Sequence, residues 1–293
     1  MIAHRRMYSS VQPANLHPAV LEHTRLGLHL LTETSGVTRR VVASALAESL
    51  LLAGRIEFFD LRQPDDADAT YVRALQAAGE ADDALLGSAI LAHAAFIPGW
   101  TNHRAEAAER LRAARTYARR GPASGEFVAW IDAVEAECDT LCGHPGDALS
   151  VIDRAEAALA ADNENRSPEW FTWFSAARLA AFKGNTQLVA GRHSQARISL
   201  GTALKDLDAG DNKQRAVVLA DLAAVEVASD KPTEACNRLH EALDQLAITW
   251  YATGMERVRK VREDLQAWAD TEEVQAIDDR LYGWRTTLNA LRR

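Results

Sequence analysis

The sequence has little of what disulfide-bonded, secreted or membrane-spanning proteins need. Its 293 residues include only three cysteines, Cys138, Cys142 and Cys236. A small, odd number in a chain of this length argues against a disulfide framework. No stretch approaches the roughly eighteen uninterrupted apolar residues of a membrane span, and no apolar segment follows the arginines near the N-terminus. We therefore expect a cytoplasmic protein without a membrane segment.

Glycine, proline and clustered positive charge are also sparse. The chain has 16 glycines and 8 prolines, no isolated run of alternating Val, Ile and Thr, and many alanines and leucines, a composition that favours an all-helical fold. The formal net charge is −8, and the 33 lysines and arginines are spread along the chain. Because phosphate contacts need clustered cations, we expect no direct nucleic-acid binding.

Motifs of catalysis are absent as well. The sequence contains no GxSxG, no P-loop, no GxGxxG after a strand and no HExxH. Acidic pairs such as Asp65-Asp66 and Asp82-Asp83 stand where helices are expected to begin, and there they stabilise the positive end of the helix dipole. We expect a binding protein that is not an enzyme and has no cofactor.

What the chain does have is a recurring helical pattern, clearest in residues 191–204, GRHSQARISLGTAL. Ala196, Leu200 and Ala203 share one face of a helix, and Gly191 is suited to the turn before it. Small, large and small residues at this spacing are typical of the second helix of a tetratricopeptide repeat, where the small residues admit a neighbouring helix.

The pattern recurs along the chain at near-regular intervals. The first alanine of each match lies at positions 67, 107, 148, 196 and 235, at intervals of 40, 41, 48 and 39 residues. This register predicts an all-α fold: a right-handed superhelical solenoid of about five to six tetratricopeptide-like helix pairs. One large globular helical bundle is the alternative, and it would not require such a register.

The pattern also predicts how the chain is divided. Residues 1–16 lack periodicity and are expected to form a disordered tail or linker. The repeat array is expected over residues 17–250, followed by a helix pair over 251–293 that caps the array or mediates dimerisation. The longest interval contains a polar insertion, ADNENRSPEW, and Ser167-Pro168 in it predicts a helix start. That helix would carry Trp170, Trp173 and Phe174.

The AxxxLxxAL second helices and the segment WFSAARLAAFKGNTQLVAGRHSQARISLGTALKDL resemble the C-terminal repeat region of a family of bacterial transcriptional regulators. Those proteins join a lambda-repressor-like helix-turn-helix domain to a tetratricopeptide sensor, and the resemblance covers roughly residues 18–270. It implies a sensor that binds a peptide or small signal and dimerises. The sequence departs from the family because only about sixteen residues precede the repeats, too few for the DNA-binding domain.

Ligands of repeat solenoids usually lie on the concave face, which the first helices line. Counting back from the second-helix alanines places inward-facing positions at Phe96, Trp130, Glu137, Arg178 and Asn185. Arg178 and Asn185, seven residues apart, could hold a peptide carboxylate and a backbone amide. The alternative is a solvated arginine and an asparagine in a loop.

Two further clusters have a functional and a structural interpretation. Trp173, with Trp170 and Phe174, could wall a ligand pocket, but we favour burial in the core between repeats. Cys138, Cys142 and His144 have the types of metal ligands, yet no fourth donor with matching spacing follows. We favour buried small cysteines and no metal.

Two functions from different classes follow. The first is a tetratricopeptide sensor that binds a peptide, a small signal or a protein partner in its groove. The second is a stand-alone self-association or scaffold module without a small ligand, most simply a homodimer through residues 251–293. Trp268, Tyr282 and Trp284 would supply its apolar surface, or they would cap the last repeat.

Overall fold

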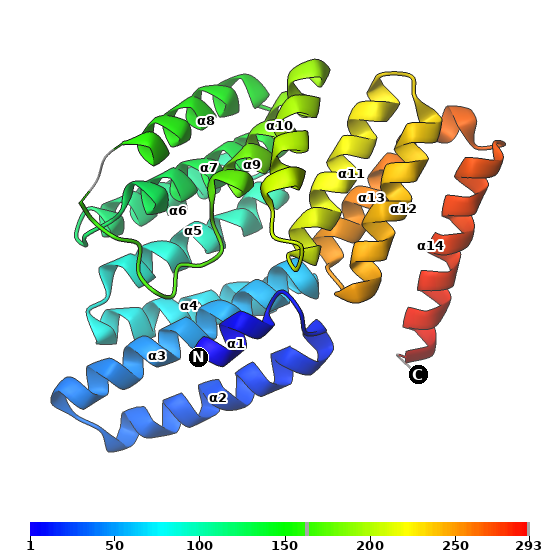
Figure 1. Ribbon diagram of the computed structural model, residues 1–293. Helices are drawn as coiled ribbons and strands as arrows, with labels where there is room; N and C mark the ends of the chain where they lie inside the picture. Colours follow the sequence, from blue (N-terminus) through cyan, green and yellow to red (C-terminus); the bar gives the residue numbers. More distant parts are fainter. Residues whose placement is uncertain (162–163, 292–293) are drawn as a thin grey trace.

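The computed structural model describes residues 1–161 and 164–291, and within those residues the regular structure is entirely helical (Figure 1). The predicted all-α class is therefore confirmed. The helices are α1 (Ile2–Met7), α2 (Pro13–Glu33), α3 (Gly36–Arg55), the π-helix η1 (Ile56–Asp60), α4 (Pro64–Ala81), α5 (Ala84–Trp100), α6 (Arg104–Ala118), α7 (Gly125–Leu141), α8 (Pro145–Ala160), α9 (Ala176–Val189), α10 (His193–Asp206), α11 (Asn212–Ala228), α12 (Pro232–Ile248), α13 (Ala252–Asp264), the 3₁₀-helix η2 (Gln266–Trp268) and α14 (Glu272–Leu291).

Five antiparallel helix pairs form the array, α3/α4, α5/α6, α7/α8, α9/α10 and α11/α12, and each pair packs on its neighbours. The alanines that define the repeat all lie on the second helices and are buried. So are the large residues four positions on, namely Tyr71, Leu111, Ile152, Leu200 and Leu239. Gly191 has a φ of +73°, as its turn requires. The predicted solenoid is confirmed, and its handedness stays a prediction.

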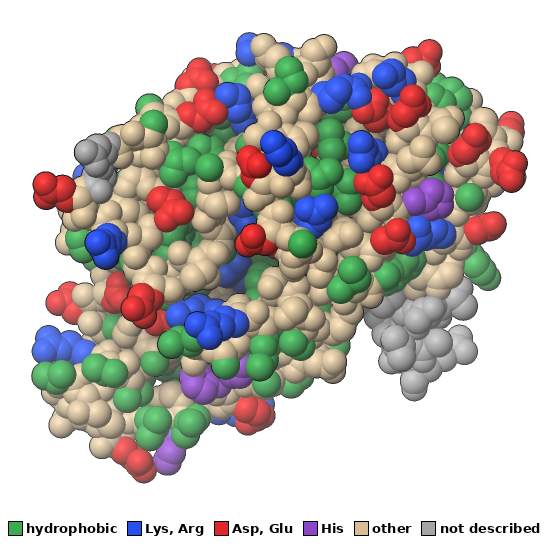
Figure 2. Space-filling view, viewed as in Figure 1, with side chains coloured by type: hydrophobic (Ala, Val, Ile, Leu, Met, Phe, Trp, Pro, Cys, Tyr) green, Lys and Arg blue, Asp and Glu red, His purple; other side chains and the backbone are tan. Residues whose placement is uncertain are grey.

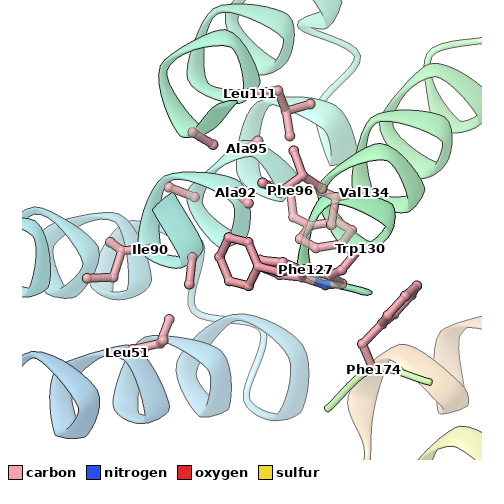
Figure 3. Close-up of a cluster of buried hydrophobic side chains, with 14 of the residues drawn as sticks. Leu51, Ile90, Ala92, Ala95, Phe96, Leu111, Phe127, Trp130, Val134 and Phe174 are labelled. Atoms are coloured by element: carbon pink, nitrogen blue, oxygen red, sulfur yellow. The ribbon is translucent and has the colours of Figure 1, made fainter. Parts of the chain in front are cut away.

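The core continues from pair to pair through the first helices. Figure 3 shows part of it, where Leu111 of α6 and Phe96 of α5 face Val134 and Trp130 of α7. Helix starts follow their capping residues: Asp83 accepts a hydrogen bond from the Leu86 amide at 2.9 Å, and Ser124 accepts one from the Phe127 amide at 3.0 Å.

The N-terminal residues differ from the expectation of a disordered tail. Residues 2–7 form α1, and α2 begins at Pro13. Arg5 of α1 forms an ion pair with Glu48 of α3, and Tyr8 packs beside a small apolar cluster of α2 and α3. Sequence periodicity missed this segment because a single helical turn held by tertiary contacts has no repeat to detect.

The segment after α8 corrects a second expectation. No helix starts at Ser167-Pro168; α9 begins at Ala176, capped by Ser175, and residues 164–175 form a loop. Asp162 and Asn163 of the expected insertion lie outside the described residues. Ser167 Oγ instead contacts Glu126 Oε2 at 2.6 Å and Ser124 Oγ at 2.8 Å. Trp170, Trp173 and Phe174 are buried in the core, as favoured, but they come from this loop.

The two ends of the array meet, so the superhelix is closed. Gln12 hydrogen-bonds to the Ile248 carbonyl and to the Trp250 amide, each at 3.1 Å. Trp250 Nε1 donates to the Asp60 carbonyl and Thr253 Oγ1 to the Phe59 carbonyl, each at 3.1 Å. These bonds join segments about 190 to 240 residues apart in sequence and place α13 against η1.

The last two helices do not form one simple cap. Helix α13 packs on α11 inside the array, whereas α14 lies along α12 at the edge (Figure 1). The Trp284 ring lies 5.6 Å from that of Trp250, and Trp268 packs on the same apolar cluster, while Tyr282 is 65% exposed. Arg292 and Arg293 lie outside the described residues. Among the helices described, none has the length and apolar character to cross a bilayer.

Candidate functional site

The closed superhelix surrounds a cavity of about 130 Å³ at its centre. Its lining residues come from the first helix of every pair, α3, α5, α7, α9 and α11, and from η1, α13, the loop before α9 and the residues after α1. None of the second helices α4, α6, α8, α10 and α12 contributes to this lining. The concave side predicted for a ligand is therefore where the cavity lies.

A larger pocket of about 800 Å³ lies outside the cavity. It is lined by α1, by the loop around Thr172 and by residues between 208 and 211. Figure 2 shows this pocket as a hollow near the centre of the face in view. Six residues line both spaces: Tyr8, Ser9, Arg55, Trp173, Arg178 and Asp211. The inner cavity and the outer pocket therefore adjoin at these residues.

Aromatic rings form one wall of the cavity. Phe59 lies 5.1 Å from Phe96 and 6.1 Å from Trp100, measured between ring centroids. His93 lies between Trp130 and Trp173, at 4.9 and 5.3 Å. Burial and the charge of Arg55 hold the pKa of His93 well below its usual value, so its ring is neutral near pH 7. This wall suits an apolar or aromatic group of a ligand.

Opposite charges meet on a second wall, in a network of four helices. Arg257 of α13 donates to Glu137 of α7 at 2.6 Å and to Asp221 of α11 at 2.7 Å. It also donates to Asn185 Oδ1 of α9 at 2.8 Å, while Asn185 Nδ2 donates to Glu137 at 2.9 Å. Burial raises the pKa of Asp221 to about 6 despite the nearby guanidinium. Burial would lower the pKa of Arg257, but Asp221 and Glu137 raise it.

A fully buried ion pair adjoins this wall. Lys213 Nζ of α11 lies 2.6 Å from Asp60 Oδ1 of η1, and the two side chains are 3% and 0% exposed. Burial raises the pKa of Asp60 and lowers that of Lys213, and each charge opposes the shift of the other. The ammonium group also lies 3.7 Å from the centroid of the Tyr8 ring.

All six residues that the sequence suggested for the site line this one cavity: Phe96, Trp130, Glu137, Trp173, Arg178 and Asn185. Arg178 and Asn185 share the inward face of α9, and Asn185 is in mid-helix and not in a loop. Both are engaged within the chain, because Arg178 forms an ion pair with Asp211 at 2.8 Å and Asn185 belongs to the Arg257 network. Their role in ligand binding stays a prediction.

Sequence reasoning missed several polar residues of the cavity, chiefly Tyr8, Arg55, Lys213, Asp221 and Arg257. Arg55 carried a signal that could have been used, since it is a lone cation within the apolar run LLLAGRIEFF. Arg257 carried none, because Arg259 and Arg262 occur on the same short helix.

In the cysteine and histidine cluster, the two cysteines are buried and His144 is exposed. Cys138 and Cys142 are buried, and their sulfur atoms lie 3.6 Å from the carbonyl oxygens of Ala95 and Gly99 on α5. Burial raises the pKa of both thiols, which keeps them protonated. Across the part of the chain that is described, no group of three or more His, Cys, Asp or Glu side chains could hold a metal ion.

No protein family's sequence profile matches the chain, and no curated protein matches it. Solved structures similar to this chain include the following two. The crystal structure of a Rap protein complexed with competence and sporulation factor has a TM-score of 0.59 and 12% identity, over 96% of this chain and 81% of that one. The crystal structure of BtubC (BKLC) from P. vanneervenii has a TM-score of 0.49 and 16% identity, over 81% of this chain and 92% of that one. The likeness to the Rap protein concerns the fold, a tetratricopeptide-like helical solenoid along almost the whole chain.

Proposed function

We propose that this chain is the sensor or interaction part of a cytoplasmic regulator, and that it binds a peptide, a small signal or a segment of a partner protein in its central cavity. The observation that carries the proposal is the cavity at the centre of the closed superhelix. Every first helix of the array contributes to it, and its walls combine aromatic rings with a few convergent charged groups. Cavities of this composition are typical of ligand sites.

Two comparisons support this function. The similar Rap protein was crystallised in complex with competence and sporulation factor, so at least one protein with a similar fold binds such a factor. The resemblance of the repeats to regulator sensors indicates the same role. We propose signal binding without catalysis, and we assign no contact with nucleic acid to this chain.

The volumes limit how a ligand can fit. A cavity of about 150 Å³ admits a benzene-sized molecule, so the inner space of about 130 Å³ holds one small ligand, or one side chain or terminus of a longer one. The remainder of a peptide would occupy the outer pocket of about 800 Å³. A long peptide lying inside the closed superhelix does not fit these dimensions.

The test is native mass spectrometry of the chain produced in its own host, compared with a variant whose cavity is filled. Ala181 of α9 lines the cavity, and Ala181→Phe would occupy much of it. Ala176→Phe on the exposed side of α9 is the matched control. We expect a bound mass on the wild type and on Ala176→Phe that Ala181→Phe has lost. If Ala181→Phe retained the bound mass equally, the cavity would be excluded as the binding site. A homodimer without a bound mass in all three proteins would favour the self-association module.

Arg178 gives a second test within the same proposal. If its guanidinium contacts the ligand, Arg178→Ala lowers the affinity for whatever the mass spectrometry identifies, although the variant also releases Asp211 from its ion pair. Asp211→Asn separates the two effects, because it breaks the pair and leaves the guanidinium in place. An unchanged affinity in Arg178→Ala would remove Arg178 from the site.

A further inference from the structure

The cations around the cavity differ in whether they have a partner. Arg178 is paired with Asp211, Lys213 with Asp60, and Arg257 with Glu137 and Asp221. Arg55 is the exception. Among the side chains that the structure describes, those of residues 1–161 and 164–284, the Arg55 side chain has no hydrogen-bond partner and no carboxylate within ion-pair distance. Yet Arg55 is only 9% exposed.

Two aromatic rings hold this guanidinium. Its central carbon lies 4.7 Å from the centroid of the Tyr8 ring and 4.6 Å from that of Trp173. Stacking satisfies the faces of a guanidinium but leaves its N–H groups, which point outward in its plane, without acceptors. The Nε atom is buried and has no acceptor. Because Arg55 lines both the inner cavity and the outer pocket, a ligand entering between them would reach these donors.

An unpaired buried cation is costly, and a bound anion removes that cost. A carboxylate fits best, because two of its oxygens can accept in-plane N–H groups of one arginine. The group attached to it would contact aromatic rings, since Trp173, Phe59 and Trp100 line the same space. The other three cations already have acidic partners, so of these four side chains Arg55 is the one whose N–H groups remain to receive a carboxylate.

We propose that Arg55 binds the carboxylate of a small amphipathic acid whose apolar part packs against the aromatic wall of the cavity. This inference rests on the proposed ligand-binding function and names the ligand's chemical class. The carboxylate can belong to a free acid held in the inner cavity. It can also be the C-terminal carboxylate of a peptide that occupies the outer pocket and inserts its last residue.

The experiment uses isothermal titration calorimetry of the full chain with two matched pairs of probes. Phenylacetate and phenylacetamide differ only in having a carboxylate or a neutral carboxamide, and so do the tripeptide Gly-Gly-Phe and its C-terminal amide. Hydrogen bonds to charged groups of this kind correspond to about 10- to 100-fold in affinity. We therefore expect phenylacetate to bind at least about tenfold tighter than phenylacetamide. A comparable acid preference for the peptide pair would identify peptide C-termini as a source, and its absence would identify free acids.

The variant test compares Arg55→Gln with Arg110→Gln, a control on α6 whose side chain pairs with Asp68 and does not line the cavity. Arg55→Gln is expected to abolish the preference for acid over amide, because it lowers the affinity for the acid and leaves the affinity for the amide nearly unchanged. Arg110→Gln is expected to keep the preference of the wild type. A preference that survives in Arg55→Gln would overturn the assignment to Arg55.

The wild-type comparison requires no variant to fold, so it decides the proposal even if Arg55→Gln is unstable. Equal binding of acid and amide would overturn the carboxylate site and leave the proposed ligand-binding function standing. Binding of none of the four probes would overturn the carboxylate site as well. The mass spectrometry of Ala181→Phe then decides the ligand-binding function separately.

Discussion

Gly184 marks a close approach between the helices of the fourth pair, α9 and α10. A Cβ atom built there would lie 2.5 Å from Leu200 Cγ, and Leu200 is completely buried on α10. Overpacking of this kind costs about 1–3 kcal/mol. We expect Gly184→Ala to lower the free energy of unfolding by that amount in urea denaturation. Gly201→Ala is the control. Gly201 also lies within a helix, α10, but no atom lies within 4 Å of a Cβ atom built there. Gly201→Ala should stabilise the chain by about 0.5–1 kcal/mol, and destabilisation of both variants alike would contradict the packing argument.

Asp221 should make stability depend on pH. Its pKa is raised from 3.8 to about 6 in the folded chain, chiefly by burial. The folded state therefore binds the proton more tightly, and this favourable contribution is present in full below about pH 4 and lost as the pH rises through 6. Asparagine does not titrate, so Asp221→Asn has no such loss of stability as the pH rises. The free energy of unfolding of Asp221→Asn relative to the wild type should rise by roughly 1–3 kcal/mol between pH 4 and pH 7. Urea denaturation at several pH values measures it, and a difference that is constant with pH would refute the shift.

At the residue scale the sequence identified several inward-facing positions, the polar Glu137, Arg178 and Asn185 among them, but not which charges meet there. Phe96 and Trp130 follow from counting along helices whose register the buried alanines define. Arg257 meets Glu137 across 120 residues of sequence, and that meeting depends on how far the superhelix turns. Local spacing holds no information on that turn, so the pairing of these charges could not be predicted from the sequence.

Among the elements, the second helices were predictable because their small-large-small pattern is repeated five times. The loop before α9 was not. Ser167-Pro168 is a good local helix start, yet Ser167 bonds to Glu126 and Ser124, and the four aromatic residues that follow are buried. Burying Trp170, Phe171, Trp173 and Phe174 stabilises the fold by several kcal/mol, more than a favourable cap contributes. Tertiary packing therefore overrode the local signal.

Helix α1 and the residues after it should act as the wall between the cavity and the outer pocket. Tyr8 stacks on Arg55 and lies near Lys213, and Arg5 pairs with Glu48. We expect deletion of residues 1–10 to leave the array folded and to expose Trp173, because it removes Tyr8, which packs on the Arg55 guanidinium that lies over Trp173. Acrylamide quenching of tryptophan fluorescence should increase in the deletion variant. The increase should be absent when Trp173→Phe is added. Unchanged quenching would mean that this segment does not cover the cavity.

At the scale of the whole molecule, the contacts of η1 with α11 and α13 hold the ends of the solenoid together. An open array would be stabilised by neighbouring pairs alone, and its ends could unfold separately. Here Asp60 and Lys213 form a buried pair between residues 153 positions apart, and Trp250 and Thr253 bond to the same turn of η1. We therefore expect the chain to unfold in one cooperative transition, with circular dichroism and tryptophan fluorescence giving the same midpoint.

The Asp60–Lys213 pair provides the sharpest test of that closure. Lys213→Met leaves a buried carboxylate without its cation, a change that typically costs about 3–5 kcal/mol. Asp60→Leu combined with Lys213→Met removes both charges and should recover most of that loss, because two apolar groups can replace a buried pair at little cost. Arg238→Met, which breaks the exposed Arg238–Glu241 pair, should change the free energy of unfolding by less than about 1 kcal/mol. Urea denaturation followed by both probes measures all four proteins. If Lys213→Met lowers the free energy of unfolding no more than Arg238→Met does, this pair does not hold the two ends together. Separate transitions by circular dichroism and by fluorescence would indicate that the solenoid opens before it unfolds.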